Sequence, residues 1–89
     1  MEESLTFGEA IEALKLGKRT AREGWNGKGM FIYHVPANEY PSQTDVAKRC
    51  FGRTTVYGAY LARKTATGEV VPWLASQTDV LAEDWQTLD

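Results

Sequence analysis

The sequence has little of the chemistry that binds metals or forms disulfides. Cys50 is its one cysteine and His34 its one histidine. A single cysteine excludes an intramolecular disulfide, and these two residues are too few soft ligands for a zinc site. We therefore expect no metal site, and the cysteine usage fits a reducing cytoplasm.

Basic charge and long apolar runs are also scarce. The chain carries 10 Lys and Arg residues against 12 Asp and Glu, with a pI of about 5.4. Duplex nucleic acids need many phosphates neutralised, and no basic stripe is present. No run approaches the roughly 20 apolar residues of a membrane span. Residues 1–5 lack the features of a signal peptide. We expect an intracellular protein with no duplex nucleic acid and no membrane as partner.

Common nucleotide-binding and catalytic motifs are missing too. The glycines between residues 24 and 29 do not match the dinucleotide fingerprint, because a strand and not a helix is predicted after them. Gly17-Lys18 is not part of a P-loop, and Ser76 lacks the flanking glycines of a nucleophile elbow. We therefore expect binding rather than catalysis, and no cofactor.

The length allows one small domain, residues 1–89. At 9.9 kDa, the folded chain is expected to expose about 5,200 Å² and to have a thin core. With 43% hydrophobic and 11% aromatic residues, some apolar surface is expected to meet a partner copy. We predict a homo-oligomer.

The order of elements predicts an α+β fold, with an N-terminal helix and a short second helix packed on a small antiparallel sheet. Thr6 with Glu9 forms a capping box, and Gly17 ends the first helix. Ser76 with Asp79 resembles a second capping box. Strands are predicted at residues 19–23, 30–35, 57–65, 69–73 and 84–88.

Two connections between these strands and the place of one strand are also predicted. Asn26-Gly27 indicates a tight hairpin turn, because both positions tolerate positive φ. Residues 36–55 have weak periodicity and are predicted to form a long loop. Pro72 cannot donate to a strand ladder, so its strand is expected at an edge of the sheet.

Two tryptophans are candidates for ligand contact. Trp73 comes directly before the polar run of residues 76–79, at the junction of a strand and a helix. Trp25 lies in the glycine-framed segment 24–29. Aromatic rings beside short hydrogen-bonding groups suit a planar, polar ligand such as a nucleotide. Both tryptophans can equally pack in the core, whereas Trp85 is expected there.

Three longer signatures resemble a known family. They are Phe7-Gly8-Glu9-Ala10, the segment 21–31 around Trp25, and the segment 71–85 around Trp73 and Trp85. Together they are similar to the small phage-encoded Thoeris anti-defence proteins of the second type. The resemblance covers nearly the whole chain apart from residues 36–56.

This resemblance implies a molecular sponge. Such proteins bind glycocyclic ADP-ribose signals, made by the TIR enzyme of the defence system, and hold them intact so that the effector is not activated. It implies a homotetramer with ligand sites between protomers, in the cytoplasm of the infected bacterial host. Some members also sequester cyclic oligonucleotides, so cyclic dinucleotides or trinucleotides are further candidate ligands. Carried over by position, the ligand contacts are Trp25, Asn26, Trp73, Ser76, Gln77, Thr78 and Asp79.

Alternatives remain at this point. A hydrolase of the same signal would use Asp79, Glu83 or Asp84 as general base. A protein-interaction module would use exposed tryptophans as hot spots. A single His34 in an apolar strand and a lone Cys50 are weaker candidates for catalysis, and binding to single-stranded nucleic acid is the weakest alternative.

Overall fold

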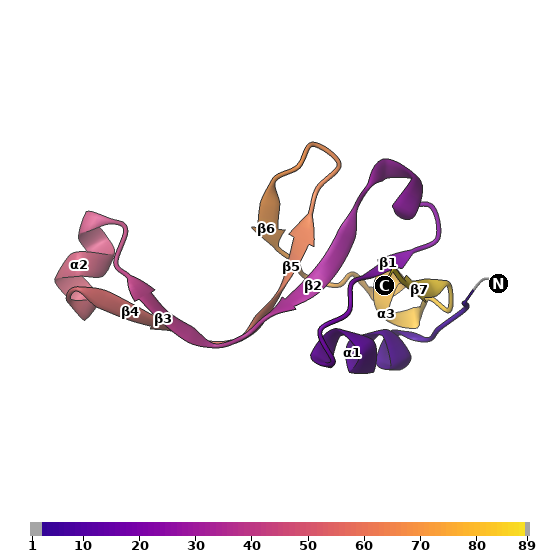
Figure 1. The fold of residues 1–89 in the computed structure, drawn as a ribbon, viewed down its shortest axis with the longest axis horizontal. Helices are drawn as coiled ribbons and strands as arrows, with labels where there is room; N and C mark the ends of the chain where they lie inside the picture. Colours follow the sequence, from indigo (N-terminus) through magenta and orange to yellow (C-terminus); the bar gives the residue numbers. More distant parts are fainter. Residues whose placement is uncertain (1–2, 89) are drawn as a thin grey trace.

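The computed structural model describes residues 3–88, which form two antiparallel sheets, three α-helices and one short 3-10 helix (Figure 1). The α+β class is thereby confirmed. The molecule is elongated, with extents of 50 × 26 × 25 Å. One end, the body (residues 3–35 and 60–88), holds the five-stranded main sheet and two helices. The other end is an arm (residues 36–59) that carries the second sheet and the third helix.

The main sheet has the strand order β6-β5-β2-β1-β7, and each neighbouring pair is antiparallel. Pro72 lies on β6 at one edge of this sheet, as predicted, because a central strand would need its missing N–H. The strands of the sheet are β1 (Thr20–Arg22), β2 (Phe31–Val35), β5 (Tyr60–Lys64), β6 (Val70–Pro72) and β7 (Trp85–Thr87).

Helix α1 (Phe7–Lys15) packs on this sheet and closes the core. The predicted capping box is present: the Thr6 hydroxyl accepts from the Glu9 N–H at 3.2 Å, and the Thr6 N–H donates to Glu9 Oε1 at 2.9 Å. Gly17 follows the helix with φ of 90°, a conformation that suits glycine. The fully buried core cluster consists of Ala10, Leu14, Ile32 and Trp85.

Helix α3 (Gln77–Leu81) connects β6 to β7 and contacts α1. The short second helix and the final strand are therefore where the sequence predicted them. The chain before α1 is tied to the same region, because Leu5 and Trp85 exchange two backbone hydrogen bonds. Within residues 3–88, no helix has the length and apolar content to cross a membrane.

The prediction of a long loop over residues 36–55 is wrong. The arm contains β3 (Asn38–Pro41), α2 (Asp45–Phe51) and β4 (Thr54–Tyr57), and β3 pairs with β4. All four residues of β3 are exposed, so the strand has no apolar alternation to reveal it. The predicted strand 57–65 also begins too early, since Tyr57 ends β4 and β5 begins at Tyr60.

The predicted two-residue turn at Asn26-Gly27 is wrong as well. Strands β1 and β2 do pair, but residues Asn26–Lys28 between them form the 3-10 helix η1. Positive φ occurs instead at Gly24 (92°) and Gly29 (71°), on either side of η1. The two glycines turn the chain at separate points, and Trp25 is placed between them.

Candidate ligand-binding surface

The three tryptophans, distant in sequence, meet in one cluster. Trp25 precedes η1, Trp73 follows β6, and Trp85 lies on β7. Ring centroids are 6.2 Å apart for Trp25 and Trp73, 5.4 Å for Trp25 and Trp85, and 6.0 Å for Trp73 and Trp85. All three pairs are nearly perpendicular, the edge-to-face geometry that aromatic rings favour.

Burial divides this cluster into an inner and an outer part. Trp85 is fully buried, which confirms its predicted place in the core. Trp25 and Trp73 are half-buried and pack against the core from outside. Phe7 of α1 supports both Trp73 and Trp85, at centroid distances of 6.2 and 5.7 Å. The two outer tryptophans therefore contribute to packing while each residue remains partly exposed to solvent.

The polar residues after Trp73 form the N-terminal turn of α3. The Ser76 hydroxyl accepts from the Asp79 N–H at 3.1 Å, and the Ser76 N–H donates to Asp79 Oδ2 at 3.0 Å. These bonds make the predicted capping box. Gln77 and Thr78 lie between the two capping residues, and both side chains are exposed. Of the four polar residues, two are used in the cap and two face solvent.

Asp79 also forms an ion pair with Arg22 of β1. Arg22 Nη1 donates to Asp79 Oδ1 at 3.1 Å, and Arg22 Nε donates to Asp84 Oδ1 at 3.0 Å. The Asp79 carbonyl accepts from Trp85 Nε1 at 3.0 Å. Asp79 is thus the point at which the helix cap, the tryptophan cluster and Arg22 join.

The environment of Asp79 favours its charged form. Burial raises the pKa of the carboxyl, but hydrogen bonds with Ser76 and Arg22 outweigh burial and leave the pKa below its ordinary value of 3.8. The hydrogen bonds to Asp84 and Asp79 raise the pKa of Arg22. Asp79 and Arg22 are therefore both ionised at neutral pH.

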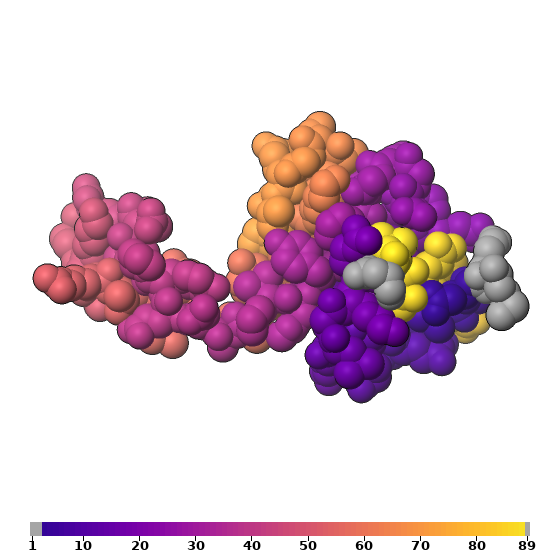
Figure 2. Space-filling model, in the orientation of Figure 1, coloured from indigo at the N-terminus to yellow at the C-terminus, as the bar shows by residue number. Residues whose placement is uncertain are grey.

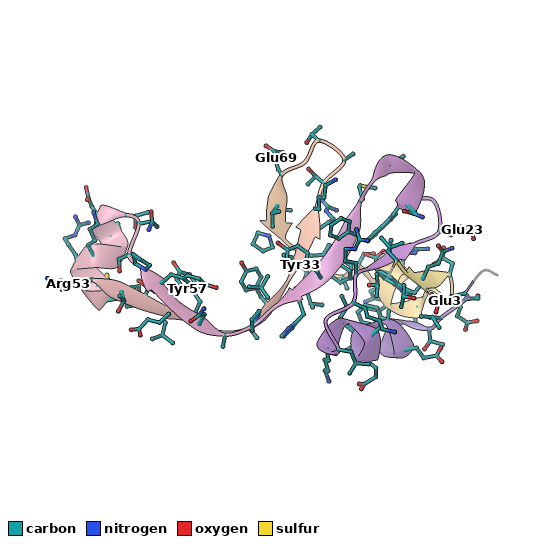
Figure 3. The ribbon with its side chains drawn as sticks, in the orientation of Figure 1. Glu3, Glu23, Tyr33, Arg53, Tyr57 and Glu69 are labelled. Atoms are coloured by element: carbon teal, nitrogen blue, oxygen red, sulfur yellow. The ribbon has the colours of Figure 1, made fainter. Side chains whose placement is uncertain are left out.

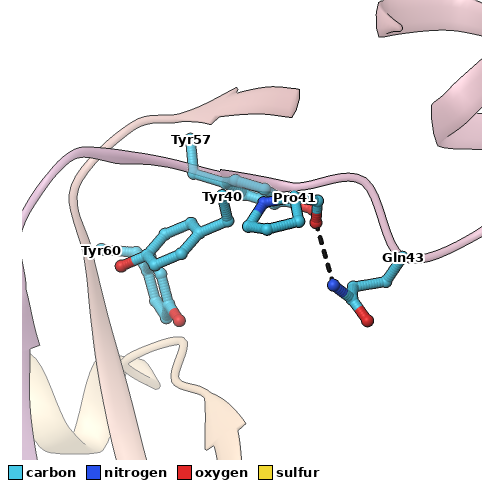
Figure 4. A pocket seen from close by; sticks show the side chains of 5 residues that line it. All are labelled: Tyr40, Pro41, Gln43, Tyr57 and Tyr60. Atoms are coloured by element: carbon cyan, nitrogen blue, oxygen red, sulfur yellow. Dashed lines mark hydrogen bonds between the residues drawn. The ribbon is translucent and has the colours of Figure 1, made fainter. Parts of the chain in front are cut away.

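Two hollows lie on the surface of the molecule near candidate residues or aromatic side chains. A hollow of about 300 Å³ is lined by Gln77, Val80 and Leu81 of α3. Another, of about 330 Å³, lies where the arm joins β5 (Figure 4). It is lined by Tyr40, Pro41, Gln43, Tyr57 and Tyr60. Neither Trp25 nor Trp73 lines this second hollow, so the hollow is separate from the predicted ligand contacts.

Comparison with known proteins gives the family. The model of the Thoeris anti-defense 2-like domain matches residues 5–88. The chain belongs to this family. It is also 40% identical, over 85 residues, to the protein named Thoeris anti-defense 2 of Bacillus phage SP01, with 96% of each chain covered. The resemblance seen in the three sequence signatures is confirmed.

Membership in the Thoeris anti-defense 2-like family covers the arm as well as the body. The matched range runs through residues 36–56, which the sequence signatures did not include. The family is named for anti-defence and not for a reaction. The arm is therefore within the family domain and not an addition outside it.

Two of the three carboxylates considered for the hydrolase alternative are engaged by an arginine in this family member. Asp79 and Asp84 are both held by Arg22. Glu83 lies beyond the end of α3 and is exposed. Among residues 3–88, no group of three or more His, Cys, Asp or Glu side chains could hold a metal ion.

Two features of the surface were not found from the sequence of this Thoeris anti-defense 2-like protein. Arg22 was part of a signature but was given no role. The available signal was a capping aspartate close in sequence to Trp73 and Trp85, because a carboxylate that is buried beside aromatic rings requires a charged or hydrogen-bonding partner. The tyrosine-lined hollow had no signal, since it needs the pairing of β3 with β4.

Proposed function

We propose that this protein is a phage anti-defence sponge that binds glycocyclic ADP-ribose signals in the cytoplasm of the infected host. It holds the signal intact, so the effector is not activated. The observation that carries the proposal is the family match over residues 5–88, which includes both tryptophan signatures. The protein acts as a homotetramer, with ligand sites between protomers.

The geometry of the body supports a nucleotide-like ligand. Trp25 and Trp73 lie together, and each is only half-buried. Stacking of a base on an aromatic ring contributes about 1–3 kcal/mol. Nanomolar binding needs about 12 kcal/mol, so the rings alone are insufficient. Gln77, Thr78, the exposed Asn26 and groups from a second protomer would supply the remaining hydrogen bonds.

In this site, Asp79 and Ser76 stabilise the turn that carries the ligand-contacting residues. Their side chains hold the first turn of α3 and connect it to Arg22. Asp79 is 13% exposed as a side chain, which leaves a small edge for a ligand. We propose that Gln77 and Thr78 make the stronger direct contacts, while Asp79 fixes the turn that presents them.

The first experiment is a release assay. Purified protein is incubated with glycocyclic ADP-ribose, unbound ligand is removed, and the protein is heat-denatured before chromatography of the supernatant. We expect intact ligand to appear only after heating. A converted product would make the protein a hydrolase and refute the sponge. Repeating the assay with cyclic dinucleotides and trinucleotides tests the second class of ligand.

A matched pair of variants tests the location of the site. Gln77 lines the hollow on α3, and Gln43 lines the tyrosine-lined hollow. Both side chains are exposed, so replacement of either by alanine is expected to leave the fold intact. We expect Gln77→Ala to weaken ligand capture about tenfold, the equivalent of one lost hydrogen bond to a charged or well-ordered group. Gln43→Ala should bind as the unsubstituted protein does; the reverse result would move the site to the arm.

A further inference from the structure

One arginine of the body has a buried donor without a partner. Arg63 of β5 is half-buried, and its Nε is buried with no hydrogen-bond partner among residues 3–88. None of the ion pairs in this part of the chain includes Arg63, whereas Arg22 bonds two carboxylates. The Thr20 hydroxyl is also buried and unpartnered, but Thr20 is 0% exposed and out of reach of a ligand. A buried donor without a partner costs free energy, and in a native structure it requires an explanation such as a bound ion.

The strand register places Arg63 close to Trp73. Arg63 lies opposite Ile32 on one side and Val71 on the other, so its side chain leaves the sheet on the same face as the fully buried Ile32. The ladder continues past the end of β6, because the Trp73 N–H donates to the Leu61 carbonyl at 2.9 Å. Arg63 and Trp73 are therefore diagonal neighbours. Such neighbours are roughly 7–8 Å apart, within reach of long and aromatic side chains.

The turn that carries Trp25 lies next to the same part of β5. Lys64, the neighbour of Arg63 in the chain, donates through Nζ to the Gly29 carbonyl at 3.0 Å, and Gly29 follows η1 as its C-cap. Figure 2 shows the β5–β6 hairpin and this turn side by side on the body, clear of the arm. The rings of Trp25 and Trp73 are 6.2 Å apart. Arg63 thus lies where the segments that bear the two outer tryptophans come together.

The carboxylates of this region have other partners. Glu69 of the same hairpin accepts from the Thr67 hydroxyl at 3.3 Å, and Figure 3 shows Glu69 at the turn end of the hairpin. Asp79 is held by Arg22. Arginine keeps its charge in proteins, and its planar fork matches the oxygens of a phosphate. Among residues 3–88, the charge of Arg63 is therefore uncompensated beside two aromatic rings, which suits a ligand that combines a planar base with phosphate.

We propose that Arg63 binds the phosphate groups of the signal nucleotide, while the base stacks on Trp25 or Trp73. This inference rests on the proposed function, and it adds the positive charge that the uncharged contacts proposed for the site do not supply. ADP-ribose signals carry a diphosphate. A hydrogen bond between guanidinium and phosphate is charge-assisted and about twice as strong as a neutral one. Arg63 thereby selects phosphate-bearing ligands over nucleosides.

The test compares ligand capture by matched variants over a series of glycocyclic ADP-ribose concentrations. Arg63→Met keeps part of the apolar stem and removes the guanidinium, and it should weaken capture at least about tenfold, the loss expected for a hydrogen bond to a charged group. Lys15→Met removes the same unit charge at an exposed position of α1, and it should capture as the unsubstituted protein does. Arg63→Lys keeps the charge without the planar fork, so its capture should lie between those of Arg63→Met and the unsubstituted protein.

Stability without ligand separates a binding role from a structural one. Because the buried Nε has no partner among residues 3–88, replacement of the guanidinium by an apolar group should leave the urea midpoint unchanged or raise it. Weaker capture together with such a midpoint supports the proposal. Capture by Arg63→Met equal to that of the unsubstituted protein overturns it, and so does a lower midpoint, which would make Arg63 structural. Capture by Arg63→Lys no better than by Arg63→Met also overturns it, because the charge would then have no effect.

The two proposals can fail independently. Full capture by Arg63→Met, beside capture by the unsubstituted protein, would leave the sponge intact and refute the role of Arg63 alone. Failure of the unsubstituted protein to capture any nucleotide would refute the sponge, and inorganic pyrophosphate then decides on Arg63. A change of tryptophan emission on titration with pyrophosphate, present in the unsubstituted protein and in Lys15→Met but absent in Arg63→Met, supports the anion site. No change in the unsubstituted protein overturns it.

Discussion

Removal of Arg22 should destabilise the body more than any other change at a single exposed or half-exposed charge. Arg22 bonds both Asp79 and Asp84, whose side chains are 13% and 33% exposed. Hydrogen bonds to charged groups contribute about 1.5–3 kcal/mol each, and a buried carboxylate without its partner carries a large desolvation penalty. We assign about 2 kcal/mol to Asp79. Asp84 receives about 1 kcal/mol, the upper value for an exposed pair, because solvent screens it. Arg22→Ala should therefore lower the free energy of unfolding by about 3 kcal/mol.

The assay is urea unfolding followed by tryptophan emission, since Trp85 donates to the Asp79 carbonyl and reports directly on this region. All proteins are compared at one concentration, because assembly contributes to apparent stability. Arg22→Lys keeps the charge but loses the planar fork that reaches two carboxylates, so we expect an intermediate loss of about 1–2 kcal/mol. If Arg22→Ala lowers the free energy of unfolding by less than about 0.5 kcal/mol, the change is no larger than that of an ordinary surface substitution. That result would refute the stabilising role of the Arg22 ion pairs.

Two further predictions concern the same region. Because the folded pKa of Asp79 lies below its ordinary value of 3.8, its carboxylate stabilises the fold above about pH 4, and this contribution is lost as the pH falls through the folded pKa. The urea midpoint should thus decrease on acidification below about pH 4, and the decrease should be smaller in Arg22→Ala. Trp85→Phe removes the donor to the Asp79 carbonyl and leaves a void in the core, so unfolding in urea should show a loss of about 2 kcal/mol.

Each of these has an outcome that contradicts it. Equal acid sensitivity of Arg22→Ala and the unsubstituted protein would mean that Asp79 does not depend on Arg22 for its ionised state. The matched change for Trp85→Phe is Trp25→Phe at a half-buried residue. Trp25→Phe should lower the free energy of unfolding by less than Trp85→Phe does. If Trp25→Phe costs as much as Trp85→Phe, the division of the cluster into an inner and an outer part is incorrect.

Local signals in the sequence predicted the body well. The two capping boxes involve residues three positions apart, and both are present in the structure. Gly17 tolerates positive φ and Pro72 lacks a backbone N–H. These properties do not depend on the rest of the fold, and both residues lie where they predict. Trp85 was assigned to the core correctly because the last strand of a small domain must pack on its helix.

The misses occur where local signals are absent or where partners distant in sequence override them. Asn26-Gly27 has the local preference for a tight turn, but Trp25 packs on Trp73 and Trp85, and this contact favours a longer connection with η1. The arm has no buried apolar face, so the periodicity that reveals strands is absent. For the candidate site, the sequence predicted the aromatic and polar residues. It could not predict the ion pair of Asp79 with Arg22, because that contact depends on the pairing of β1 with β7.

The arm is inserted between two neighbouring strands of the main sheet, β2 and β5, and this position has a consequence for how the family can vary. Val35 of β2 faces Tyr60 of β5 on the last rung of their ladder, so a two-residue turn would suffice to join the two strands. The arm occupies the place of that turn. An unstructured insertion of residues 36–59 would raise the entropic cost of closing the hairpin by only about 2 kcal/mol, and pairing of β3 with β4 extends the same ribbon. Insertions, deletions and exchanges here therefore leave the register of the main sheet unchanged. During evolution, relatives could therefore replace the arm without altering the pairing that holds the tryptophan cluster together within one chain.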